Sequence, residues 1–100
     1  MNNTISPRGQ TWREVRKEFY TEEEIRESDL RVAIISELIK ARNDKGITQR
    51  DLEQLSGVRQ PIISRLEAGS TSPQLDTILR VLAPLGKTLA VVSIDQAVET

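Results

Sequence analysis

The chain has 100 residues and a formal net charge of −1; 37% of its residues are hydrophobic and only 3% are aromatic, which suits a single domain with a core of Leu, Ile, Val and Ala. It contains no Cys and no His, which excludes a disulfide framework, a thiolate zinc site, an imidazole base and a pH switch near neutrality. Residues 1–10 are polar, and no apolar run approaches the roughly 20 residues that span a bilayer, so we expect a cytoplasmic protein without a membrane partner.

The N-terminal segment carries two possible helix starts. Thr11 and Thr21 each have Glu three residues later, the pattern of a capping box. Between them, three apolar residues at i, i+3 and i+7 form one stripe of a short helix. These residues are Trp12, Val15 and Phe19. The stripe either packs on the rest of the fold or is a surface for a partner protein.

The next predicted helix begins near residue 29 and ends near Lys45 and Gly46, where Gly suits the left-handed position after a helix. It has two apolar stripes. The first consists of Leu30, Ile34, Leu38 and Ala41, and the second of Val32, Ile35 and Ile39. This is too much apolar surface for packing on one side, so either the N-terminal segment or a second subunit must cover the helix.

Two short helices follow. Thr48 is the expected N-cap of the first, with Asp51 favouring the positive helix end. Gly57 reverses the chain tightly, Val58 sits beneath the turn, and the second helix spans residues 59–69. The residues expected to form a shared core are Leu52, Leu55, Ile63 and Leu66. This spacing predicts a helix-turn-helix, whose second helix enters the major groove of DNA.

Residues 75–85 predict a last helix, whose final turn Pro84 should distort. Its apolar side consists of Leu75, Ile78, Leu79 and Leu82. The β-branched run within residues 87–95 predicts one strand. A lone strand leaves backbone groups unpaired, so we expect it to pair with a twin subunit or with the sheet of a partner.

The DNA-facing side of the second short helix follows from helical phase. With its apolar residues inward, Gln60 and Ser64 point outward, together with the helix start around Arg59 and Pro61, and Arg65 lies beside them. Gln can pair with adenine and Arg with guanine. The alternative is that these are ordinary solvated side chains.

Several spaced elements together resemble the phage-repressor-like helix-turn-helix family (the Cro/C1 or XRE class) over residues 32–86. They are ITQRDL, GV, ISRLEAG, SPQLDT and LG, at residues 47–52, 57–58, 63–69, 72–77 and 85–86. The resemblance implies a mainly α, lambda-repressor-like bundle at residues 29–86. We expect it to carry extra N-terminal helices at residues 1–28 and one β-strand with a tail at residues 87–100.

The resemblance also implies roles for individual residues. The DNA-binding positions are Thr48, Gln49, Arg59, Gln60, Pro61, Ser64 and Arg65. Gln49 matches a phosphate-binding position at a helix start. Arg42 and Glu67 match a structural ion pair. Arg59 replaces the usual Ser or Thr cap, which weakens the cap and adds a cation near the DNA.

The flanks, SDLRVAII at residues 28–35 and APLGKTLAVV at residues 83–92, together with Trp12, resemble HigA antitoxins. That resemblance implies a homodimer that represses its own operon by binding double-stranded operator DNA. It also implies neutralisation of a HigB toxin, a RelE-like endonuclease that cleaves mRNA on the ribosome. The alternative is a free-standing regulator without a toxin partner. No cofactor, metal or catalytic role is expected.

Residues 1–30 carry a net charge of −2 and residues 31–69 a net charge of +2. Because such toxins bind RNA and are usually basic, the acidic N-terminal segment is the candidate toxin-binding surface. Its candidate residues are Trp12, Val15, Phe19, Glu22, Glu23 and Glu24, with Glu14, Glu18 and Glu27 nearby. The alternative is a solvated acidic helix face without a specific partner.

Overall fold

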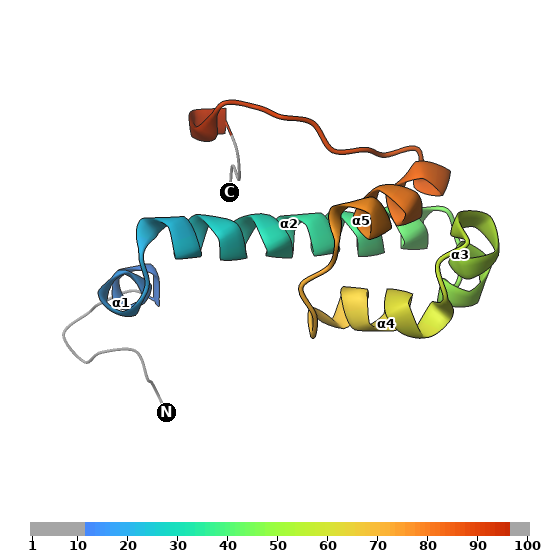
Figure 1. The fold of residues 1–100 in the computed structure, drawn as a ribbon, viewed down its shortest axis with the longest axis horizontal. Coiled ribbons are helices and arrows are strands. Elements are labelled where there is room, and N and C mark those ends of the chain that lie inside the picture. Colours follow the sequence, from blue (N-terminus) through green and yellow to red (C-terminus); the bar gives the residue numbers. More distant parts are fainter. Residues whose placement is uncertain (1–11, 97–100) are drawn as a thin grey trace.

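The computed structural model describes residues 12–96, and this part of the chain forms five α-helices and two short 3-10 helices. The longest helix, α2 (Glu22–Asp44), is the spine of the molecule (Figure 1). Helix α1 (Trp12–Phe19) lies at its N-terminal end. The other three α-helices gather around its C-terminal half. The mainly helical fold expected from the sequence is confirmed.

The start of α2 is the second predicted capping box. Thr21 Oγ1 accepts a hydrogen bond from Glu24 N at 3.1 Å, and Thr21 N donates to Glu24 Oε1 at 2.9 Å. The first predicted cap, at Thr11, lies outside the described residues. Helix α2 runs without a break across residues 28 and 29, so the expected N-terminal extension and the helix-turn-helix unit share one helix. It ends as predicted, with Gly46 at φ +68°.

The core is built by the second half of α2 with α3 (Gln49–Ser56), α4 (Gln60–Ala68), α5 (Leu75–Leu82) and η1 (Ala83–Leu85). Its buried members are Leu38, Ala41, Leu52, Val58, Ile63, Leu66, Ile78, Val81, Leu82 and Leu85. The η1 turn is the predicted distortion at Pro84. No helix within residues 12–96 combines the length and the apolar character needed to cross a bilayer.

Several apolar residues expected to point inward are not buried. Leu55 has 60% of its surface exposed, because the inward side of α3 is formed by residues 49, 52, 53 and 56. The space beneath the turn is occupied by Val58. On α5, Ile78 and Leu82 are buried whereas Leu75 and Leu79 are exposed. On α2, Leu30 and Val32 are exposed. Helical periodicity identifies an apolar side, but the neighbouring helices decide how much of it is covered.

The predicted C-terminal β-strand is wrong. Residues 87–93 carry no strand in the structure, and a 3-10 helix, η2 (Ile94–Gln96), follows them. The segment runs back along α2 (Figure 1), with Leu89 packed against the core and Lys87 Nζ 3.7 Å from Glu37 Oε1. A strand needs a neighbouring backbone for its ladder, and the described residues provide none. β-branched composition expresses only a preference that depends on this context.

Candidate nucleic-acid interface

The first helix of the motif, α3, begins at the predicted cap. Thr48 Oγ1 accepts a hydrogen bond from Asp51 N at 3.0 Å, and Thr48 N donates to Asp51 Oδ2 at 2.8 Å. Two amides of the helix start are thereby satisfied, and a carboxylate lies in the first turn, where the helix dipole favours it. The entry of the chain into the motif is therefore fixed locally.

The turn between α3 and α4 has the expected geometry. Gly57 adopts φ +77°, and its amide donates to Glu53 O at 2.9 Å. Val58 is buried beneath the turn, and its amide donates to Ser56 Oγ at 3.1 Å. Arg59 occupies the N-cap of α4 without a capping hydrogen bond from its side chain, as its departure from the usual Ser or Thr predicts.

Helix α4 buries Ile63 and Leu66 and turns its polar edge outward. The seven predicted DNA-binding residues lie together on the start of α3 and the first half of α4. Thr48, Arg59, Pro61 and Arg65 are exposed, and Gln49, Gln60 and Ser64 are half-buried. None of the seven belongs to the core. Their contact with DNA stays a prediction, but each is accessible at one surface.

A continuous chain of polar side chains connects this surface to α2. Arg42 donates to both carboxylate oxygens of Glu67, from Nε at 2.7 Å and from Nη2 at 2.9 Å. Gln49 Nε2 donates to Glu67 Oε1 at 3.0 Å, and Gln60 Nε2 donates to Gln49 Oε1 at 2.8 Å. The side chain of Gln60 is therefore oriented from α2 through the ends of α4 and α3.

The Arg42–Glu67 pair is shielded from solvent, with side-chain exposures of 14% and 7%. The hydrogen bond to Glu67 raises the pKa of Arg42 above its ordinary value. Arg42 Nη1 also donates to Ile47 O at 3.0 Å, so one guanidinium ties together α2, the loop before α3 and the last turn of α4. The geometry is that of a structural pair, as the resemblance implied.

Two hydrogen bonds in this series of polar side chains were not foreseen from the sequence. Gln49 and Glu67 are 18 residues apart, and Gln60 and Gln49 are 11 apart, so no local spacing signals either bond. The chemistry still leaves Gln60 able to read a base. An amide nitrogen carries two hydrogens and the amide oxygen accepts, and the bond to Gln49 uses one hydrogen. The bidentate pattern suited to adenine therefore stays available.

The residues predicted to bind a toxin lie at the other end of α2, on α1 and on the first turn of α2, and their contact with a toxin stays a prediction. Trp12 and Phe19 are exposed, Val15 is half-buried, and Glu22, Glu23 and Glu24 occupy the exposed first turn of α2. Helix α1 is attached through an ion pair that the sequence analysis missed, between Arg16 Nη2 and Asp29 Oδ1 at 2.9 Å. Trp12 and Glu24 share a groove between α1 and α2.

Comparison with known proteins agrees with this motif. The helix-turn-helix family profile matches residues 38–92. A Haemophilus influenzae protein described as an uncharacterized HTH-type transcriptional regulator is 59% identical over 90 residues, which cover 90% of this chain and 92% of that protein. A Sinorhizobium fredii protein of the same description is 34% identical over 58 residues, covering 58% and 75% of the two chains.

A solved structure described as a toxin-antitoxin module from Streptococcus pneumoniae contains a similar chain. It is 65% identical, superposes with a TM-score of 0.74, and the match covers 86% of this chain and 96% of that one. The match is longer than the helix-turn-helix profile, so the similarity includes sequence outside the motif.

Proposed function

This chain belongs to the helix-turn-helix family, and on that premise we propose that it is the antitoxin of a toxin–antitoxin pair and represses its own operon. More specifically, we propose that it is a HigA-type antitoxin that neutralises a HigB-like mRNA endonuclease and binds operator DNA as a homodimer in the cytoplasm. The DNA-binding half of the proposal is supported by the polar edge of α4. This edge lies at the surface of a packed bundle, and Gln60 on it is held in place by Gln49. The relatives' description as transcriptional regulators argues against a catalytic role.

In the proposed complex, α4 enters the major groove with Gln60, Ser64 and Arg65 toward the bases. The start of α3, at Thr48 and Gln49, approaches the phosphates, where helix-end amides favour an anion. A homodimer would place two such helices about 34–36 Å apart, one turn of DNA, on a palindromic operator.

The antitoxin part is supported by the similarity to a chain of the Streptococcus pneumoniae toxin-antitoxin module. The layout of the fold is compatible with two partners, because α1 and the motif lie at opposite ends of α2 (Figure 1). A helix of 23 residues is about 34 Å long at 1.5 Å per residue. A toxin at α1 and DNA at α4 therefore need not compete for the same surface.

The test is a fluorescence-anisotropy titration of a fragment of the gene's own promoter at low salt, with the chain alone and with the toxin of the Streptococcus pneumoniae module. We expect sequence-specific binding that Gln60→Ala and Arg65→Ala weaken, while both variants still bind toxin. Failure to bind the promoter in either condition would refute the repressor proposal. Promoter binding without any toxin binding would favour the alternative, a free-standing regulator.

A further inference from the structure

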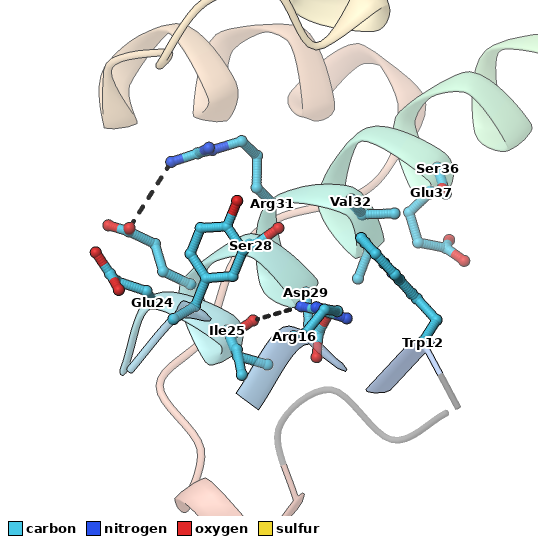
Figure 2. A pocket seen from close by; sticks show the side chains of 13 residues that line it. Trp12, Arg16, Glu24, Ile25, Ser28, Asp29, Arg31, Val32, Ser36 and Glu37 are labelled. Atoms are coloured by element: carbon cyan, nitrogen blue, oxygen red, sulfur yellow. Dashed lines mark hydrogen bonds and ion pairs between the residues drawn. The ribbon is translucent and has the colours of Figure 1, made fainter. Parts of the chain in front are cut away.

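An open groove of about 930 Å³ separates α1 from the first half of α2 (Figure 2). Two large apolar side chains on opposite elements line it and are mostly exposed, Trp12 at 62% and Val32 at 60%. Figure 2 shows the indole of Trp12 directed along α2 toward Val32. Tyr20, at the junction of the two helices, also lines the groove. A side chain inserted here would contact apolar surface from both helices.

Helix α1 is attached at a defined position beside this groove. Arg16 Nη2 lies 2.9 Å from Asp29 Oδ1 and donates to Ile25 O at 3.5 Å, and the Arg16 side chain is only 19% exposed. The groove therefore has two walls fixed to each other by a partly shielded ion pair.

The charge of the lining is acidic. Four carboxylates line the groove, those of Glu24, Glu27, Asp29 and Glu37, against two guanidiniums, those of Arg16 and Arg31. Arg16 is committed to Asp29. Arg31 lies 4.0 Å from Glu27, and Lys87 Nζ, which does not line the groove, lies 3.7 Å from Glu37 Oε1; exposed pairs of this kind contribute little. Around the apolar floor, four carboxylates therefore face three cations.

We propose that this groove is the docking site for a basic, amphipathic segment of a partner protein. An apolar side chain of the segment would insert between Trp12 and Val32, and its Lys or Arg side chains would pair with the carboxylates around it. The inference rests on the proposed function, in which that partner is the RNA-cleaving toxin. It differs from the surface expected from the sequence, because Val15, Phe19, Glu22 and Glu23 do not line the groove.

Trp12 is the only tryptophan of the chain, so 5-fluorotryptophan provides a single ¹⁹F signal inside the groove. We expect titration with the purified toxin of the Streptococcus pneumoniae module to shift this resonance to saturation, and to reduce its solvent isotope shift between H₂O and D₂O. Added salt should weaken the binding, because the contacts around the groove are ionic.

Val32→Lys and Phe19→Lys form a matched pair of variants. Both replace an exposed apolar residue of a helix with a cation, but only Val32 lines the groove. Measured by calorimetry, Val32→Lys should weaken toxin binding by about 30-fold or more, as for a central interface residue. Phe19→Lys should change it by no more than about twofold, as for an ordinary surface residue. Unchanged promoter binding would show that both variants are folded.

Five results would overturn the inference. Toxin binding by calorimetry without a change at Trp12, or an equal loss in the two variants, would place the toxin on another surface. A resonance that shifts with concentration of the chain alone would make a second copy the occupant. A signal already shielded from solvent in the chain alone would make one of its own segments the occupant. If the toxin does not bind the wild-type chain at all, the proposed antitoxin function fails with the inference.

Discussion

Replacing Arg42 with Ala should destabilise the fold far more than replacing another cation of the same helix. The change removes both hydrogen bonds to Glu67 and the bond to Ile47 O. It leaves a carboxylate that is 7% exposed with Gln49 as its remaining side-chain donor. Breaking a buried pair on one side costs about 3–5 kcal/mol, and because one donor remains we expect about 3 kcal/mol.

The matched control is Lys40→Ala. Lys40 pairs with Asp44 on the same helix at 3.2 Å, but the side chains are 70% and 65% exposed, and such an i,i+4 pair contributes about 0.5 kcal/mol or less. In urea unfolding, with a slope of about 1 kcal/mol per molar for a small protein, the midpoint should fall by about 3 M for Arg42→Ala and by less than about 0.5 M for Lys40→Ala. Equal shifts would refute the argument from burial.

The pH dependence of this contribution follows from the raised pKa of Arg42. A raised pKa in the folded state means that the stabilisation is fully present below the pKa of the unfolded chain and is lost only as the pH rises through the folded value. The difference between wild type and Arg42→Ala should therefore stay constant around neutral pH. A difference that changes across neutrality would contradict the assignment to this guanidinium.

A double variant separates stability from recognition. In Arg42→Met/Glu67→Leu, apolar side chains replace the whole pair, and such replacements are often neutral or stabilising. Gln49 then loses its acceptor on Glu67, so Gln60 is held less firmly. We expect urea stability near that of wild type together with weaker promoter binding. Wild-type promoter affinity in this variant would show that the polar chain does not orient Gln60.

Three further predictions concern the motif itself. Gln60→Ala should cost about 1–3 kcal/mol of discrimination at one base pair, measured by anisotropy with operator variants; uniform weakening across all sequences would contradict base contact. Gly57→Ala should cost about 1–2 kcal/mol in urea unfolding because φ is +77°, a left-handed conformation that disfavours a Cβ. No clash with the rest of the fold adds to this cost, because the new Cβ meets no atom within 4 Å beyond the adjacent residues. Leu52→Ala should cost about 2–5 kcal/mol and Leu55→Ala about 0.5 kcal/mol or less, and equal losses would contradict the observed burial.

Features encoded by neighbouring residues were predictable. The caps at Thr21 and Thr48, the reversals at Gly46 and Gly57, and the limits of the two short helices depend on contacts within a few residues. The helix-turn-helix spacing could be predicted from the sequence for the same reason. The predicted outward edge of α4 also held, because Ile63 and Leu66 fix the phase of that helix.

The sequence by itself thus determined the order of the helices, the turn between α3 and α4, and the position of the polar edge of α4. Only the tertiary structure decided that Leu55 is exposed, that residues 87–93 remain without a strand partner, and that Gln49 connects Gln60 to Glu67. The groove beside Trp12 also depends on the packing of α1 against α2. The physical reason is that burial, strand pairing and side-chain hydrogen bonds require a second element, whose position depends on the packing of the whole chain.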